Sequence, residues 1–206
     1  MKIAIIGAGN VGGALALGWA KAGHEIIIGA KDPNSAKVKK VTSQNSGIKV
    51  TSVKDASNEA EVILIAATSS AVEEISKELG DVKNKIIIDA MNSIAVESAG
   101  YQNSFEALKS LTNCENIVKC FNTTGFENMA NPKYGNTSLD MFMAGDSIKG
   151  KQVASRLARD AGSAEGYDFG GDDKVALLEQ FTLVWINLAI FQKQGRNIAF
   201  KVIRKQ

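Results

Sequence analysis

The sequence predicts an α/β fold with a doubly wound, mainly parallel sheet and a small helical extension at the C-terminal end. Over the first 145 residues, short segments rich in Ile and Val alternate with helical patterns. Strands of this composition are typical of parallel sheets that helices cover on both faces. From about residue 150 the strand pattern fades and helical patterns dominate. We therefore expect a sheet domain over residues 1–148 and a helical extension over residues 149–206.

Strands and helices are expected in alternation along the chain. Helix candidates include 33–40, which begins at Pro33, a residue favoured in first turns, and 151–161, which ends at Gly162. The segments 70–79 and 105–111 also have helical patterns. The apolar strand candidates are 2–6, 25–28, 49–51, 61–67, 85–89, 117–121 and 141–144. This order is that of repeated βαβ units.

The first strand leads directly into a glycine-rich turn at residues 7–12, with the spacing Gly-x-Gly-x-x-Gly. Gly7 permits a sharp turn, Gly9 lets the backbone approach a pyrophosphate, and Gly12 lets the helix lie close to the strand. A helical pattern then runs to Ala22, and a second strand follows. This context predicts a Rossmann dinucleotide-binding unit with the phosphates at the helix N-terminus. A tight turn without a ligand is the alternative.

The residues after the second strand bear on the choice of dinucleotide. In such units an acidic side chain about twenty residues beyond the glycine turn binds the ribose hydroxyls of NAD. That position is Gly29 here, followed by Ala30 and Lys31. The missing carboxylate and the nearby ammonium favour NADP(H), whose 2′-phosphate is anionic. If Asp32 instead turned inward and Lys31 outward, NAD would be the better ligand.

The composition argues against several other classes of protein. A chain of 206 residues, 45% of them hydrophobic, can bury one core with a small appendage. A net charge of +2 is too small for an electrostatic nucleic-acid platform. Cys114 and Cys120 show neither metal-ligand spacing nor a disulfide framework, and His24 lies in a corner between elements, so no metal site is expected. Reduced cysteines and the lack of a preceding signal peptide predict a cytoplasmic protein.

The apolar segment 175–191 needs a partner but is not expected to span a membrane. Glu179, Gln180 and Asn187 interrupt it, and it falls short of the about twenty apolar residues that a bilayer requires. One helix face is expected to carry Leu177, Phe181, Val184, Leu188 and Phe191. So broad an apolar surface is expected to pack on the nucleotide domain, on a second copy of the chain, or on a flat apolar ligand.

Ligands of such sheets bind beyond the carboxyl ends of the strands, where this sequence places neutral polar groups. Ala67 and Thr68 follow the fourth strand, Asn92 follows the fifth and Asn122 the sixth. Amides and hydroxyls suit a carboxamide and a heterocyclic acceptor. No His or Tyr stands at these ends, so we assign no catalytic residue, and transfer between nicotinamide and a flavin-like or deazaflavin ring is favoured.

Two lysines are candidate proton donors. Lys119 lies in the sixth expected strand and Lys133 in a later loop. The alternative for each is a solvated surface lysine.

The longer motifs resemble those of a known family. The turn at 7–12, the segment 89–92 and above all residues 118–129, with Phe-Asn-Thr-Thr-Gly, are similar to the NADPH-dependent deazaflavin (coenzyme F420) reductases. Their superfamily includes the cytosolic domain of the six-transmembrane ferric reductases. The resemblance extends over nearly the whole chain, including 141–146 and 197–201. It implies a Rossmann domain binding NADP(H), a planar acceptor lodged against C-terminal helices, and often a homodimer.

The resemblance also implies roles for particular residues. Ala30 and Lys31 would hold the 2′-phosphate, and Thr68, Met91 and Asn92 would line the nicotinamide side. The pyrophosphate would be held by Gly7, Gly9, Asn10, Val11 and Gly12.

Three departures from the family pattern stand out. Ala30 and Lys31 replace the usual hydroxyl and arginine, so the bidentate phosphate contact is lost. Ser93 stands where a proline is common. Asp172 and Asp173 replace an apolar, arginine-containing segment near the expected acceptor site, which does not favour an acceptor with an anionic tail.

Three functions remain open on the sequence. The favoured one is an NADPH-dependent reductase of a planar acceptor, a deazaflavin or a flavin such as FMN. The second is a redox-sensing module that binds NADP(H) and passes its state to a partner. The third is a reductase of a small metabolite, for which Asp172, Asp173 and Lys174 supply charge.

Overall fold

A computed structural model describes residues 1–94 and 98–205 and confirms a mainly parallel α/β sheet. The strand order is β10-β9-β6-β5-β4-β1-β2-β3, and only the β6–β9 pair is antiparallel within the described sheet. β7 and β8 form a separate hairpin. The strands are β1 (Lys2–Ile6), β2 (Glu25–Gly29), β3 (Lys49–Thr51), β4 (Val62–Ile65), β5 (Ile86–Asp89), β6 (Asn116–Cys120), β7 (Lys133–Tyr134), β8 (Thr137–Ser138), β9 (Met141–Ala144) and β10 (Gly166–Asp168).

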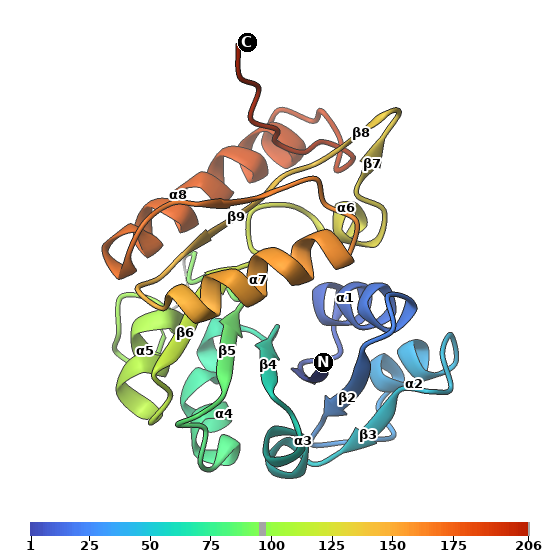
Figure 1. Ribbon diagram of the computed structural model, residues 1–206, viewed down its shortest axis with the longest axis vertical. Coiled ribbons are helices and arrows are strands. Elements are labelled where there is room, and N and C mark those ends of the chain that lie inside the picture. Colours follow the sequence, from blue (N-terminus) through green and yellow to red (C-terminus); the bar gives the residue numbers. More distant parts are fainter. Residues whose placement is uncertain (95–97, 206) are drawn as a thin grey trace.

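Helices cover both faces of the sheet (Figure 1). One apolar core lies under α1, α2 and α7, and the other under α3, α4, α5 and α8. The helices are α1 (Asn10–Lys21), α2 (Ala36–Thr42), α3 (Val53–Glu59), α4 (Val72–Leu79), α5 (Ser104–Leu111), α6 (Phe126–Ala130), α7 (Ile148–Asp160) and α8 (Val175–Ile186). Short turns η1 (Ser69–Ala71) and η2 (Asp172–Lys174) precede α4 and α8, and the π-helical turn η3 (Asn187–Phe191) extends α8.

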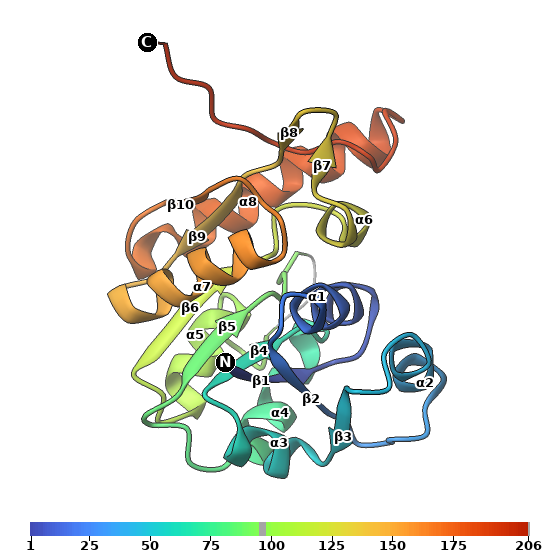
Figure 2. The same ribbon diagram turned by 45° about the vertical axis from the view of Figure 1, so that its right-hand side comes forward.

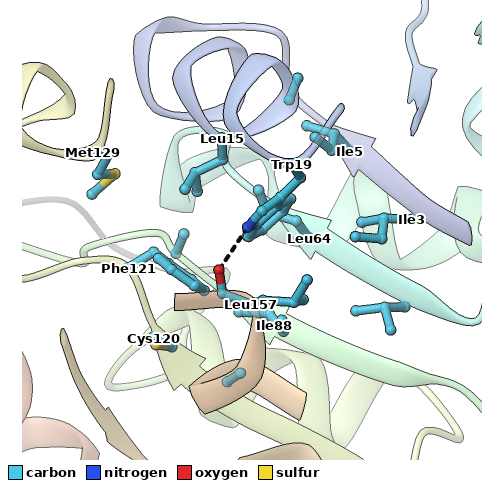
Figure 3. Close-up of a cluster of buried hydrophobic side chains, with 14 of the residues drawn as sticks. Ile3, Ile5, Leu15, Trp19, Leu64, Ile88, Cys120, Phe121, Met129 and Leu157 are labelled. Atoms are coloured by element: carbon cyan, nitrogen blue, oxygen red, sulfur yellow. Dashed lines mark hydrogen bonds between the residues drawn. The ribbon is translucent and has the colours of Figure 1, made fainter. Parts of the chain in front are cut away.

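Trp19 is the centre of the first core. Its ring is fully buried and meets Phe121 edge to face at 5.4 Å between centroids. The indole Nε1 donates a hydrogen bond of 2.9 Å to the carbonyl oxygen of Leu157 (Figure 3). Because Trp19 lies on α1, Leu157 on α7 and Phe121 after β6, this contact connects the first βαβ unit with the later half of the chain.

The sheet extends beyond the expected boundary at residues 148 and 149. α7 packs on β5, β6 and β9, and β10 pairs in parallel with β9 from Gly166 to Asp168. β10 is missing from the sequence prediction because three residues carry too little pattern. The division into 1–148 and 149–206 stays a prediction, although α7 and β10 belong to the sheet layers.

α8 lies beside β9 and β10, at the end of the molecule opposite to α3 (Figure 2). Part of the expected apolar face does not pack on the nucleotide domain, because Leu177, Val184 and Phe191 are 50%, 47% and 70% exposed. Its packing on a second copy of the chain or on a ligand stays a prediction. The opposite face packs on the protein through Val175, Leu178, Glu179, Thr182 and Trp185. By length and composition alone, the helical segment Asp172–Phe191 of 20 residues is long and apolar enough to cross a bilayer. The expectation that residues 175–191 do not span a membrane stays a prediction.

Candidate functional site

Two glycines of the turn at 7–12 are required by the protein's own backbone. Gly7 has φ +106°, and a Cβ there would lie 2.5 Å from the carbonyl oxygen of Ala66. A Cβ on Gly12 would lie 1.9 Å from the carbonyl oxygen of Gly7. These contacts hold β1, the turn and the first residues of α1 close to the end of β4. The sharp turn and close approach predicted for Gly7 and Gly12 are therefore present.

Gly9 is a glycine for a different reason. Its φ is −73°, which any residue can adopt, and among the described residues no heavy atom lies within 4 Å of a Cβ built on it. As N-cap of α1, it also offers no side-chain hydrogen bond to the first amides of the helix. The free N–H groups and the helix dipole favour an anion at this point. The space that a side chain would fill is left open among the described residues.

A cavity of about 290 Å³ begins at this helix end. Its walls come from α1, α2 and α6, and they combine apolar groups with two lysines, Lys37 and Lys40. The lining also includes Gly9, Asn10, Ala14, Val41, Gln44, Phe126 and Ala130. Neither lysine is predicted by the motifs of the sequence; their spacing of three on the helix after the second strand is the signal that could have identified them.

Lys31 does not line this cavity. It is exposed and forms an ion pair with Glu74 of α4, and the hydrogen bond that Lys31 donates to Glu74 raises the pKa of Lys31. Asp32 does not turn inward either, because its Oδ1 accepts a hydrogen bond of 2.9 Å from the exposed backbone N–H of Asn34. Ala30 is half-buried. An NADP 2′-phosphate would compete with Glu74 for Lys31.

The polar residues after β5 and β6 are brought together as predicted. Asn92 Nδ2 donates to the carbonyl oxygen of Asn122, and Asn122 Nδ2 donates to Asn92 Oδ1, both at 3.1 Å. Thr182 of α8 donates to the same Asn122 carbonyl. Asn122 Oδ1 is buried and has no hydrogen-bond partner among the described residues. A ligand N–H would satisfy it.

The other predicted residues lie near this edge in different environments. Ala67 is half-buried after β4, Thr68 is exposed and Met91 is 1% exposed. Phe121, directly before Asn122, has φ +62° although its ring is fully buried. A bulky residue in this region is strained, and such strain is found where the surrounding structure fixes a functional group. Here it sets the direction of Asn122.

A charged cluster that no local motif predicts is buried at the same edge of the sheet, beneath Asn92 and Asn122. Lys119 is fully buried, so the solvated alternative for it is wrong. Its Nζ lies 3.0 Å from Asp89 Oδ2, 2.5 Å from Glu179 Oε1 and 3.2 Å from Ser104 Oγ. Asp89 is fully buried and Glu179 is 9% exposed. The second lysine candidate, Lys133, is exposed on β7.

The two acids before α8 have structural partners. Asp172 forms an ion pair with Lys109 of α5 and accepts a 2.7 Å hydrogen bond from the backbone N–H of Asp146. Asp173 pairs with the neighbouring Lys174. These contacts fix the loop that leads into α8.

The cysteines and the histidine show no metal site. Cys120 is buried, and burial raises its pKa; Cys114 is half-buried and its pKa is raised for the same reason. His24 lies between the N-terminal amine and Asp160, at 3.3 and 2.9 Å. Across residues 1–94 and 98–205, no three His, Cys, Asp or Glu side chains are grouped to hold a metal ion.

The βαβ turn, the uncapped helix end and the polar strand ends define a dinucleotide-binding oxidoreductase fold. Residues 2–93 match the family model described as "NADP oxidoreductase coenzyme F420-dependent", so this part of the chain is similar to that family. The F420-dependent NADP reductase of Methanothermobacter marburgensis is 27% identical over 220 residues, which cover 98% of each chain.

Two further similarities are to a solved structure and to a relative with a different named activity. The solved structure of a putative F420-dependent NADP reductase from Arthrobacter sp. FB24 shares the fold with a TM-score of 0.84 at 23% identity, over 99% of this chain and 100% of that one. The glycerol-3-phosphate dehydrogenase (NAD(P)+) of Thermoanaerobacter sp. (strain X514) is 26% identical over 210 residues, 86% of this chain. The chain spans 64% of the length of that relative.

Proposed function

We propose that this protein is an NADP(H)-dependent oxidoreductase that passes hydride between the nicotinamide and a planar acceptor, a deazaflavin or a flavin. The observation that carries the proposal is the uncapped N-terminus of α1 at Gly9, which opens into a cavity with two lysines. The α1 amides would bind the pyrophosphate. Lys37 and Lys40 supply the positive charge that favours a 2′-phosphate over a bare ribose.

The nicotinamide would supply the hydride, and the chain's residues would bind and orient the ring. Asn122 Oδ1, buried without a partner among the described residues, is the acceptor that a carboxamide N–H requires. The reciprocal bonds with Asn92 fix the Asn122 side chain, so its carbonyl oxygen is held in one direction. Such fixed orientation lowers the cost of bringing two rings together.

Aromatic side chains around β9 and α8 pack on one another. Phe142 stacks with Tyr167 at 6.0 Å and contacts Phe181 edge to face at 5.0 Å, and Phe181 contacts Phe200 at 4.5 Å. The M. marburgensis relative is named for F420, and we carry that acceptor class to this chain as a proposal. FMN is the parallel candidate.

A homodimer and a cytoplasmic location are part of the proposal, as is the absence of a nucleic-acid or membrane partner. Leu177, Val184 and Phe191 are exposed at intervals of seven along one side of α8 and η3. A stripe with this period packs against a like stripe of another helix. Sedimentation of the wild type and of Val184→Glu would give dimer and monomer, respectively.

The test of function is anaerobic oxidation of NADPH with the deazaflavin coenzyme, followed by the absorbance of both cofactors, with FMN in parallel. Turnover with either ring supports the proposal. NADPH binding without turnover with either ring would contradict it. Such a result would favour the sensor or an oxidoreductase of a small metabolite, for which glycerol 3-phosphate with NADP+ is the first substrate to test.

The choice of cofactor can be tested on α2. Lys37→Ala should weaken the binding of NADPH about tenfold and leave the binding of NADH unchanged, because a lost phosphate contact of this kind is worth roughly 1.4 kcal/mol. Lys39→Ala is the matched control, since Lys39 is exposed on the same helix and does not line the cavity. Equal losses for both cofactors, or an equal effect of Lys39→Ala, would contradict the assignment. Titrations of intrinsic fluorescence give the affinities.

A further inference from the structure

The loop after β5 is held at both ends by carboxylates of the buried cluster. Asp89 Oδ1 accepts a hydrogen bond of 2.9 Å from the backbone N–H of Met91. Glu179 Oε1 accepts one of 3.4 Å from the backbone N–H of Ser93. Asn92, between them, is bonded to Asn122. The segment proposed to line the nicotinamide therefore lies directly on two acidic groups.

Lys119 bridges the carboxylates of Asp89 and Glu179. Its Nζ contacts Asp89 Oδ2 and Glu179 Oε1, so one ammonium joins β5, β6 and α8. Ser104 Oγ donates to Asp89 Oδ2 at 2.7 Å. The two carboxylates and one ammonium sum to a single negative charge, and water reaches this cluster only at the 9% exposed Glu179.

Buried charge acts over longer distances than surface charge, because little solvent screens it. The nicotinamide ring is neutral when reduced and carries one positive charge after its hydride has left. An excess negative charge near the ring therefore stabilises the oxidised form more than the reduced one. A neutral cluster would not distinguish the two forms electrostatically.

We propose that the Asp89–Lys119–Glu179 cluster positions the loop 90–93 and biases the site towards oxidised NADP+ through its net negative charge. The inference rests on the proposed function, since it presumes that this loop faces the nicotinamide. The bias lowers the barrier to hydride loss from NADPH and so favours reduction of the acceptor. Lys119 and the two acids are positioning residues that act through the loop and through their field.

Glu179→Gln tests the proposal, because it keeps the shape of the side chain and removes the excess charge. The dissociation constants of NADP+ and NADPH are measured by titration on the intact protein. We expect the NADP+ constant to rise roughly tenfold relative to that of NADPH, as for two unit charges about 10 Å apart at an effective dielectric constant of about 20. Asp89→Asn should change the ratio in the same direction, and it serves if Glu179→Gln does not fold.

Two controls separate charge from structure. Ser104→Ala removes a hydrogen bond from the cluster without changing its charge, and Glu106→Gln removes an exposed carboxylate on the same helix, α5. Both should leave the ratio of the two constants unchanged.

The outcomes distinguish the inference from the function on which it rests. A ratio that changes in Glu179→Gln and Asp89→Asn but not in the controls supports the bias. Equal weakening of both cofactor forms, or no change in either, overturns the bias but does not contradict the proposal that the protein binds NADP(H). Wild-type protein that binds neither form would overturn the proposed function, and the inference with it.

Discussion

The glycine turn at residues 7–12 and the Asp89–Lys119–Glu179 cluster lie at the same edge of the sheet, but they are built in opposite ways. The turn consists of contiguous backbone, in which Gly7 and Gly12 permit close backbone contacts and Gly9 leaves open the space proposed for a phosphate. The cluster consists of three side chains separated by 30 and 60 residues, and it excludes water from charged groups. A site made of contiguous backbone can therefore be predicted from a local motif, whereas a site made of side chains depends on packing between distant elements.

The largest loss of stability is expected from a variant that breaks the Asp89–Lys119–Glu179 cluster. Lys119→Met leaves two buried carboxylates without their cation, which should cost about 3–5 kcal/mol of unfolding free energy. Urea unfolding at pH 7 measures it. The triple variant with Asp89→Asn and Glu179→Gln should recover a large part of the loss, because no charge then remains unpaired. A loss below about 1 kcal/mol in Lys119→Met would show that the ion pairs do not hold the fold.

The turn can be broken without changing any charge. Gly12→Ala would place a Cβ 1.9 Å from the carbonyl oxygen of Gly7, so β1 and α1 must separate, at a cost of about 1–3 kcal/mol or more. Gly18→Ala on the same helix meets no atom within 4 Å among the described residues and should stabilise by about 0.5–1 kcal/mol. Thermal unfolding of both variants gives the difference. Equal melting temperatures would refute the close packing.

Gly9→Ala should separate binding from stability within the same turn. The new methyl group meets none of the described residues, so the melting temperature should stay within about 2 °C of the wild type, but the methyl group fills the phosphate space. NADPH affinity should fall at least about tenfold, roughly 1.4 kcal/mol. Wild-type affinity in this variant would mean that the phosphates do not lie at Gly9.

The smallest effect concerns the C-terminal segment. Partial burial raises the pKa of Glu127, but the hydrogen bond from Arg196, a backbone hydrogen bond and the charge of Arg196 together outweigh it and hold the pKa below its ordinary value of 4.5. A depressed carboxyl pKa stabilises the fold above the unfolded-state value, and this stability is lost as the pH falls through the folded-state value. Arg196→Ala should cost about 0.5 kcal/mol at pH 7 and progressively less below about pH 4.5.

Urea unfolding at several pH values tests this dependence. Lys205→Ala, an exposed residue of the same segment, is the control and should show no such change. A constant loss across the pH range in Arg196→Ala would assign the effect to the guanidinium packing over Phe126 and Trp185 instead.

The sequence predicted the βαβ unit and most strands because their patterns are local. The segments expected at 2–6, 49–51 and 141–144 agree with β1, β3 and β9 to the residue. It also predicted that Asn92 and Asn122 would meet, since the carboxyl ends of neighbouring parallel strands share an edge. The sequence did not show that Leu177, Val184 and Phe191 face away from the nucleotide domain. α8 is apolar almost all round, so its periodicity leaves open which side packs on that domain.

The sequence by itself determined the fold class, the glycine turn and the strand ends around which a dinucleotide site is built, because strand periodicity and glycine geometry act over a few residues. The tertiary structure alone decided that Lys119 is buried, that Glu179 reaches it from α8, and that Lys37 and Lys40 line the cavity while Lys31 pairs with Glu74. The environment of a charged side chain is set by the elements packed against it, and those elements come from distant parts of the chain.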